Sequence, residues 1–558
     1  MREIARVGGK PKVISQIYLG SPERVRDLAR GEPQAERTLQ VQEFGALWLA
    51  QQMDQDVGLA GIINAVIKRG ARETGPTVGE YFLYAVLNRM VEPRSKRALP
   101  DWYRCTAIQQ IRPVDVDALT SERYWEKWER VSEAKLEKIA RKFFEKIWEL
   151  ESPQADCMLF DTSNYYTFMA SDTESDLAQR GKNKAGRHHL RQIGLALLVD
   201  RGSRLPLYYQ AYPGNRHDSR EFATLMDEMF GIVCGLNQTK ERLTVVIDKG
   251  MNAEGNFSWI DEHSRIHFVT SYSTYFAEDL VATPLERFEL VDTEKNKRLA
   301  EQGHADDRLR AFRTQGVYWG KERSVVVTYY PPTARKQGYT FDSKLTQLRE
   351  ELLEMRAKVR AQSKHWRDPN AIRERYLRSC ERFHISSACY ELSFAHEDDR
   401  LTMSFRKNIY HIEQKRQLFG KSIIITDNID WSTTEIVEAH LGRWEVEDRF
   451  RQSKDPALVG VMPLRHWTDS KIRCHLFTCV VALTYLRRLE RRLHAHGIPR
   501  TAKDVMDDMD HLHSVLTLEK GARKPRRRLE TPTKTQTEVL SALDYRIDAR
   551  GVLQPLTA

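Results

Sequence analysis

The chain has 558 residues, of which 41% are hydrophobic and 30% are charged, and its formal net charge is +10. This length is too great for one hydrophobic core, so we expect about three soluble domains. The excess of basic residues predicts an anionic partner, although net charge carries no information about the fold.

Cysteine spacing and hydropathy exclude two further classes. The seven cysteines form no CxxC pair, which argues against a zinc site and is typical of thiols in a reducing compartment. The sequence lacks a signal peptide, and no apolar run approaches the roughly 18 residues of a membrane span. We therefore expect a cytoplasmic protein without a membrane partner.

Periodicity along the chain predicts five successive regions. The pattern is mainly helical at first, then changes to apolar strands, then becomes β-rich around a helical hairpin, and finally returns to a strand and helices. The hairpin is indicated by apolar residues at steps of 3 and 4, from Leu345 to Val359. The expected regions are an N-terminal, mainly helical region (1–150), the first part of an α/β core (151–250), an insertion (251–420, with its helical hairpin at 342–384), the second part of the core (421–495) and a C-terminal region (496–558) whose basic tail from Gly521 is expected to be mobile. Basic residues at the turns of the N-terminal region suit either duplex DNA binding or a solvated helical scaffold.

The core is expected to be a mixed α/β sheet of five strands with flanking helices. Three apolar runs, a helix, a fourth run that ends at Ile247 and a last run at 421–428 supply these strands. We expect Asp161 and Asp248 at the carboxyl ends of two of them. If those two strands are parallel neighbours, their final residues lie side by side.

One helix, expected over 434–454, carries a third acid. His440, Arg443, Glu447 and Lys454 fall within an arc of about 60° at about 100° per residue. Such a stripe suits a metal-binding carboxylate among phosphate-binding cations. An exposed helix stitched by an Arg443–Glu447 ion pair is an equally good interpretation of the helix alone.

Together, Asp161, Asp248 and Glu447 make an all-oxygen donor set, which favours Mg²⁺ or Mn²⁺ over zinc. Without metal the three carboxylates would repel one another and would also repel DNA. Two divalent ions would remove both objections and could act on a phosphodiester. A single aspartate at a strand end is more often a turn former, so the joint pattern carries the prediction.

These segments resemble the bacterial insertion-sequence transposases of the DDE class. The resemblance rests on FDTSNYY around Asp161, VIDKGM around Asp248, SIIITDN, and HLGRWEVEDRFRQSK, which fits a Tyr–x2–Arg–x3–Glu–x6–Lys signature with His440 in place of the tyrosine. It implies a ribonuclease-H-like core that an insertion interrupts. It also implies cutting at the element's ends and joining of the 3′-hydroxyls to target DNA, with two metal ions per site and a homodimer on DNA. The implied partners are terminal inverted repeats and target DNA, in a bacterial cell near the nucleoid.

Further candidate DNA contacts lie outside the acidic set. The resemblance makes Arg443 and Lys454 phosphate contacts and leaves the role of His440 open. The basic loop 180–191 is either a phosphate-binding loop or a solvated loop; its candidates are Lys182, Lys184 and Arg187. Trp319 is either a base-stacking residue or an interior residue of a sheet.

Two other functions compete with transposition. One is a metal-dependent nuclease on the same core that only hydrolyses DNA. The other is a DNA-binding protein that has lost catalysis, which the presence of all three acids argues against.

Overall fold

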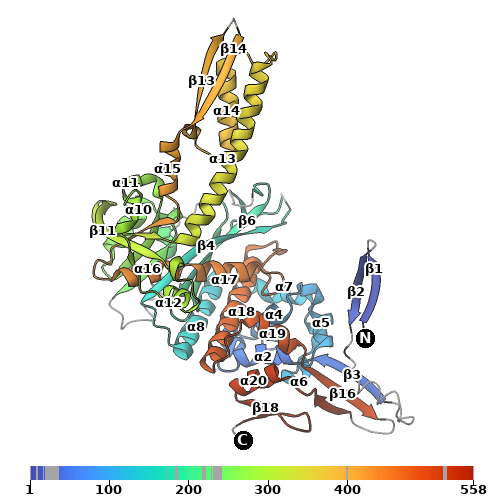
Figure 1. Cartoon of the computed structure of the whole chain (residues 1–558). Coiled ribbons are helices and arrows are strands. Elements are labelled where there is room, and N and C mark those ends of the chain that lie inside the picture. The colour runs from blue at the N-terminus through green and yellow to red at the C-terminus, as the bar shows by residue number, and fades with distance from the viewer. Residues whose placement is uncertain are drawn as a thin grey trace. The chain divides into compact units, whose positions relative to one another are not determined.

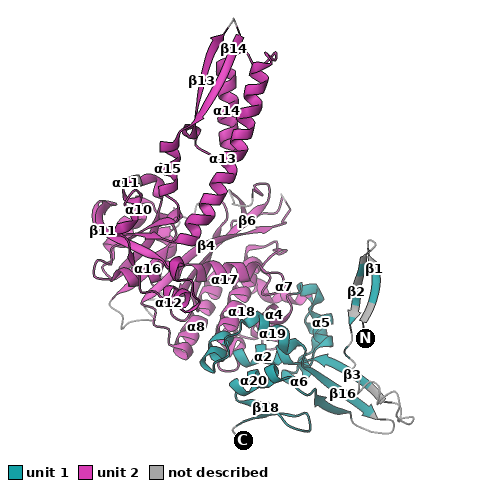
Figure 2. Cartoon of the chain, in the orientation of Figure 1, with its two compact units in different colours: residues 1–53, 94–120, 489–558 teal, residues 54–93, 121–488 magenta. Residues whose placement is uncertain are grey.

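A computed structural model gives the fold of residues 2–7, 10–16, 18, 37–170, 172–181, 186–216, 222–227, 229, 231, 242–397, 400–519 and 525–556. The chain forms two compact units (Figures 1 and 2). Unit 1 comprises residues 1–53, 94–120 and 489–558, and unit 2 comprises residues 54–93 and 121–488. Each unit is therefore assembled from segments that are distant in the sequence.

A ten-stranded mixed sheet forms the centre of unit 2 (Figure 1). Its strands follow the spatial order β10-β11-β12-β15-β9-β8-β4-β6-β5, and β7 also pairs with β6. The strands are β4 (Cys157–Thr167), β5 (Gln179–Arg180), β6 (Arg191–Asp200), β7 (Pro206–Pro213), β8 (Leu243–Ile247), β9 (Ile266–Tyr272), β10 (Glu289–Leu290), β11 (Arg310–Tyr318), β12 (Lys321–Tyr329) and β15 (Lys421–Thr426).

The α/β class of the core is confirmed, but the expected number of strands is wrong. The strand beside β8 is β9, which is parallel to it, whereas the sequence pattern suggested 421–428 as the last core strand. That segment forms β15, which pairs antiparallel with β9 and then with β12. The sheet continues because β12 and β15 are both apolar and buried, so each needs a neighbour on its open edge.

Strand β4 is longer than the sequence suggested. It runs 11 residues to Thr167, so Asp161 lies within the strand and not at its end. Its parallel pairing with β8 stops at Leu159↔Val246, while its antiparallel pairing with β6 continues to Thr167↔Arg191. Asp161 therefore lies where β4 has just lost one of its two neighbours.

Helices cover the sheet of unit 2 through aromatic packing. Phe144 on α8 contacts Tyr208 on β7 with ring centroids 5.5 Å apart, and Phe477 on α18 contacts Tyr209 at 6.1 Å. The helices of unit 2 that lie wholly within the described residues are α3 (Leu59–Val66), α4 (Val78–Val91), α7 (Ser121–Glu129), α8 (Glu133–Glu151), α10 (Glu254–Glu262), α11 (Glu278–Val281), α12 (Glu294–Glu301), α13 (Pro331–Arg360), α14 (Pro369–Phe383), α15 (Ile409–Gln417), α16 (Thr433–Leu441), α17 (Trp444–Lys454) and α18 (Asp469–Ala495), of which residues 469–488 belong to this unit.

The expected single helix at 434–454 is two helices, α16 and α17, separated at Gly442 and Arg443. Both separating residues keep right-handed helical dihedral angles, so the chain turns only slightly there. Ser432 caps α16 in a capping box with Glu435. A glycine inside a helix weakens it, which explains why the break falls at this point.

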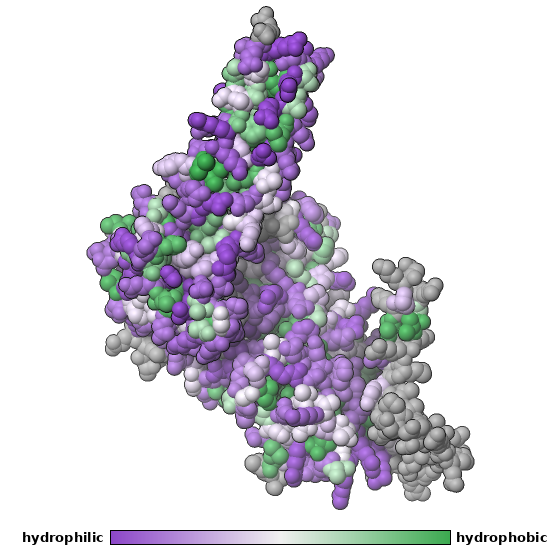
Figure 3. All heavy atoms as spheres, in the orientation of Figure 1, coloured by the Kyte–Doolittle hydropathy of each residue, from purple (hydrophilic) through white to green (hydrophobic). Residues whose placement is uncertain are grey.

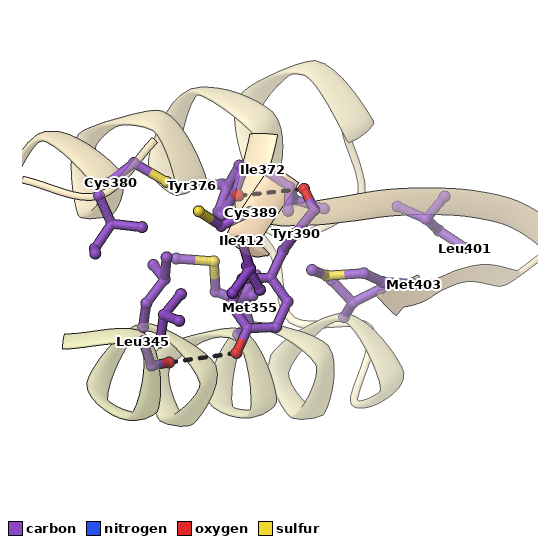
Figure 4. Packing of buried hydrophobic residues seen from close by; sticks show 14 residues of the cluster. Leu345, Met355, Ile372, Tyr376, Cys380, Cys389, Tyr390, Leu401, Met403 and Ile412 are labelled. Atoms are coloured by element: carbon purple, nitrogen blue, oxygen red, sulfur yellow. Dashed lines mark hydrogen bonds between the residues drawn. The ribbon is translucent and has the colours of Figure 1, made fainter. Parts of the chain in front are cut away.

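The α13–α14 hairpin and the hairpin of β13 (Tyr390–Glu397) and β14 (Arg400–Lys407) share a hydrophobic core of their own. Leu345, Leu348, Leu352, Met355 and Val359 line the buried face of α13, as their spacing predicts. The Tyr390 hydroxyl donates to the carbonyl of Leu345, and the Tyr376 hydroxyl donates to the carbonyl of Tyr390 (Figure 4). We call these four elements the insertion lobe. On the face drawn in Figure 3 its surface is mostly hydrophilic, with small apolar patches between.

Unit 1 contains the two chain ends and residues 94–120. Strand β16 (His513–Glu519) pairs with β3 (Arg37–Glu43) on one side and with β17 (Arg526–Leu529) on the other. Its remaining elements are β1 (Arg2–Val7), β2 (Lys10–Gln16), α2 (Gly45–Asp54), α5 (Leu99–Cys105), α6 (Ile108–Ile111), α19 (Ala502–Asp510), α20 (Lys534–Ala542), β18 (Tyr545–Ile547) and β19 (Leu553–Pro555), with short 3-10 turns between.

The basic tail that the sequence predicts to be mobile begins at Gly521, whereas residues 525–556 contain regular secondary structure. These residues form β17, α20 and the β18–β19 hairpin, and α20 begins with a capping box between Thr533 and Gln536. Val539 and Leu540 are buried, so two apolar side chains are enough to anchor a segment of basic composition. Among the described helices, none has the length and apolar character needed to cross a bilayer.

The insertion lobe should depend on its own core. Replacing Leu352, which is fully buried, with alanine should lower the local stability of the lobe by about 2–5 kcal/mol. Hydrogen exchange followed by mass spectrometry should show faster exchange in α13 and α14 and unchanged exchange in β4 and β6. The matched control is Leu377→Ala on α14, which is 47% exposed and should change little. Equal loss of protection across the central sheet would contradict an independent core.

Candidate active site

Two aspartates meet at the carboxyl edge of the parallel strands of unit 2. The register pairs Leu159 of β4 with Val246 of β8, so that two residues further on Asp161 and Asp248 are at equivalent positions. Asp248 directly follows β8 and accepts a hydrogen bond from the backbone N–H of Lys249. Ligand sites of open α/β sheets lie at this edge.

Asp161 is in a poor environment for a charge. Burial raises its pKa to about 6, and the neighbouring carboxylates of Asp248 and Glu447 add to this effect. A hydrogen bond from the backbone N–H of Thr162 and the charge of Arg443 act in the opposite direction. The negative charges of Asp248 and Glu447 are therefore close enough to raise the pKa of Asp161.

Arg443 joins the second and third acids. Its Nη1 lies 2.6 Å from Oδ1 of Asp248, and its Nη2 lies 2.6 Å from Oε1 of Glu447. Burial opposes the charge of Arg443, but its hydrogen bond with Glu447 and the charges of the three acids outweigh burial and raise its pKa. One guanidinium therefore offsets part of the repulsion among the three carboxylates.

Lys454 lies further along β4. Its Nζ donates to Oγ of Ser163 over 2.6 Å and lies 5.4 Å from the centre of the Tyr165 ring. The Tyr165 hydroxyl in turn shares a hydrogen bond of 2.5 Å with Oγ of Ser453, the residue before Lys454. These contacts attach the end of α17 to the strand that carries Asp161. The helical residues Arg443 and Lys454 therefore contact Asp248 and the strand of Asp161, respectively.

Comparison with known proteins identifies the family. Residues 166–485 match the family model of the transposase DDE domain. The chain belongs to the DDE transposase family. This family consists of metal-dependent enzymes that cleave and join DNA, so the chain is a DNA transposase. The matched range includes Asp248 and Glu447 and begins five residues after Asp161.

Two solved transposase structures are also similar to this transposase. The piggyBac transposase synaptic complex with hairpin DNA is 9% identical, with 83% of this chain and 78% of that chain covered and a TM-score of 0.36. The Mos1 transposase paired-end complex with the left transposon end is 11% identical, with 45% of this chain and 90% of that chain covered and a TM-score of 0.16. No curated protein matches the sequence.

His440 lies near the acids of the transposase but is held neutral. Burial is the main reason that its pKa falls to about 4, and the nearby positive charge of Arg443 lowers it further. A neutral imidazole can give a hydrogen bond to a phosphate but cannot add a positive charge. His440 therefore does not act as a third cation near neutral pH.

The donor chemistry of the three acids fits a hard divalent cation, because all of the donors are carboxylate oxygens. As the side chains are arranged here, no group of three or more His, Cys, Asp or Glu in the described ranges could hold an ion. Arg443 forms ion pairs with one oxygen each of Asp248 and Glu447.

The remaining predicted site residues lie away from the acids or outside the described residues. Lys182 and Lys184 lie outside the described residues. Arg187 is exposed, and its guanidinium carbon lies 5.3 Å from the centre of the Tyr166 ring on β4. Trp319 lies in the turn between β11 and β12, is half-buried and stacks on Phe257 of α10 with ring centroids 3.6 Å apart, so it is not an interior residue of the sheet.

Sequence reasoning missed two serines at this site. Ser163 accepts the hydrogen bond from Lys454, and Ser271, near the end of β9, lies 3.5 Å from Nη1 of Arg443. Ser163 could have been found, because it lies two residues after Asp161 and thus on the same face of the strand. Ser271 has no signal in the sequence, since β9 was not expected in the core sheet.

The raised pKa of Asp161 makes stability depend on pH. Its folded pKa of about 6 exceeds the value of about 3.9 for an unfolded aspartate, so ionisation opposes folding and wild-type stability falls between about pH 4 and pH 6. Asp161→Asn should therefore be more stable than wild type at pH 7, on the order of 2 kcal/mol, and equal to it near pH 4. Urea unfolding of both proteins at the two pH values measures this difference. The exposed Glu254→Gln is the control, and a difference independent of pH would contradict the account.

Proposed function

We propose that this transposase cuts DNA at the ends of its own insertion sequence and joins the freed 3′-hydroxyls to target DNA with two divalent metal ions. The observation that carries the proposal is that Asp248 and Glu447 share the guanidinium of Arg443, while Asp161 is close enough for its pKa to respond to the charges of all three residues. Three acids beside the one guanidinium of Arg443 leave a negative charge that suits cations. Mg²⁺ or Mn²⁺ is the expected pair of ions, since all of the donors are oxygen.

The metal ions, when bound, would activate water and stabilise the charge that develops on phosphate oxygens. The chain's own residues have separate roles. Asp161 and Asp248 hold their carboxylates at equivalent positions of two strands, and Glu447 approaches from α17. The rigid sheet fixes the positions of Asp161 and Asp248, which favours a fixed geometry of the site.

In this proposal Arg443 pairs either with the acids of the site or with a DNA phosphate. In the absence of metal it pairs with Asp248 and Glu447. When cations neutralise those acids, its planar guanidinium is free to bind a DNA phosphate in a bidentate manner. Lys454 then provides a second phosphate contact, and neutral His440 provides a hydrogen bond.

The DNA partners follow from the same proposal. Terminal inverted repeats and target DNA would both reach this site, and two ends held together require a homodimer on DNA. We propose the helical region within 1–150 for repeat recognition and the insertion within 251–420 for clamping the ends, with the basic loop that includes Arg187 along the backbone phosphates. The protein would act at the bacterial nucleoid.

Each of the three acids should be indispensable for DNA cleavage. On a plasmid that carries the gene with its own flanking DNA, Asp161→Asn, Asp248→Asn and Glu447→Gln should each reduce Mg²⁺-dependent cleavage by at least about 10³-fold, because each would remove a metal ligand. Gel analysis of the plasmid measures the effect. Glu254→Gln, six residues after Asp248, is the control and should retain wild-type activity. Full activity in any acid variant would refute the assignment.

Strand transfer separates a transposase from a nuclease on the same core. With a second plasmid as target, the wild-type protein should produce joined molecules in addition to cleaved ends, since a free 3′-hydroxyl can attack a phosphodiester. Sequencing of the junctions detects this product. If only cleaved ends accumulate, the protein hydrolyses DNA and the joining step is excluded.

A further inference from the structure

A second candidate binding site of unit 2 is a pocket beyond the end of β4. Its volume is about 920 Å³, which is within the range of ligand sites. It is lined by Trp125, Phe168, Pro463, Arg465, His466, Trp467, Thr468 and Lys471. None of these residues takes part in the arrangement of the three acids.

The aromatic side chains of this pocket are unusually exposed. Trp467 is 54% exposed, Trp125 is 46% exposed and Phe168 is 57% exposed. Exposed apolar rings gathered in one place indicate a binding surface, because burial in the core would otherwise be favoured. A flat aromatic face suits the flat face of a nucleobase.

The charge of the pocket is complementary to a phosphate backbone. Arg465 is exposed and lines the pocket together with Trp467. Lys471 also lines the pocket, and its Nζ lies 2.7 Å from Oε2 of Glu129. Arginine and lysine beside aromatic rings are the combination that binds single-stranded nucleic acid, through phosphate contacts and base stacking. A purely apolar ligand would not account for these cations.

The pocket is attached to the strand that carries the first acid. Oγ1 of Thr167 donates to the carbonyl of Leu464 over 3.1 Å, and Phe168 directly follows Thr167. From Asp161 to Thr167, β4 spans about 20 Å at about 3.3 Å per residue. This distance corresponds to at most about six nucleotides, because the rise is about 3.4 Å per nucleotide in a B-form strand and an extended unpaired strand covers the distance with fewer.

From these observations we propose that the pocket binds an unpaired nucleotide of the DNA strand that passes the three acids, with its base stacked on Trp467 and its phosphate near Arg465. Trp125 and Phe168 line the space beside that base. The position of the nucleotide, within about six nucleotides of the cleavage point, rests on the proposed function. The preference for unpaired DNA rests only on the pocket.

Binding of single-stranded and duplex DNA by the full-length protein tests the proposal. Fluorescence anisotropy with a labelled oligothymidylate of about 20 nucleotides should show about 5-fold to 100-fold weaker binding for Trp467→Ala and Phe168→Ala than for wild type. Affinity for a duplex of the same length should change by less than about twofold, since paired bases cannot reach the rings. Trp467→Phe, which keeps an aromatic face, should restore most of the single-strand affinity.

Ile429→Ala, at a 51% exposed apolar residue that follows β15 and lies outside the regions proposed to contact DNA, is the control and should bind both DNAs as wild type does. Unchanged oligothymidylate binding by Trp467→Ala, or an equal loss for single-stranded and duplex DNA, would overturn the proposal. Neither outcome depends on metal or on cleavage. The cleavage test of the three acids and the binding test of the pocket can therefore give opposite outcomes, so failure of one proposal is distinguishable from failure of the other.

Discussion

The repulsion among three carboxylates is the constraint on which the site of this transposase depends. Asp161 and Asp248 are held at equivalent positions by the pairing of β4 with β8, so neither can move away without disturbing the sheet. Arg443 pairs with Asp248 and Glu447, yet the pKa of Asp161 still rises to about 6, with burial as the largest cause. A buried carboxylate beside two further acids is a favourable place for cations, and the rigid centre of the fold holds it there.

The two-helix arrangement of α16 and α17 gives Arg443 its position. It lies at the separation between the helices, four residues before Glu447, and so reaches Asp248 and Glu447 at the same time. Lys454, at the other end of α17, is fixed through Ser163 of β4. Lys454, which is expected to contact a DNA phosphate, is thus anchored to the strand that carries Asp161. This contact connects the phosphate-binding residue to the catalytic acid.

Much of this site could be predicted from the sequence because its signals are local. The apolar runs before Asp161 and Asp248 and the spacing of Arg443, Glu447 and Lys454 needed no knowledge of distant contacts. The strand that completes the parallel set, β9, could not be recognised, because its sequence resembles the other strands that follow it and only pairing with β8 distinguishes them. The folded C-terminal residues were missed for a similar reason, since β17 depends on β16 and its composition is basic.

Manganese electron paramagnetic resonance of the wild-type protein tests the central claim most directly. The claim is that Asp161, Asp248 and Glu447 hold two ions in place of the charge of Arg443. Titration with Mn²⁺ should give an exchange-coupled signal from a pair of ions about 3.5–4 Å apart, and Asp248→Asn should abolish that signal. A spectrum of free Mn²⁺, or of single isolated ions that Asp248→Asn leaves unchanged, would contradict the account.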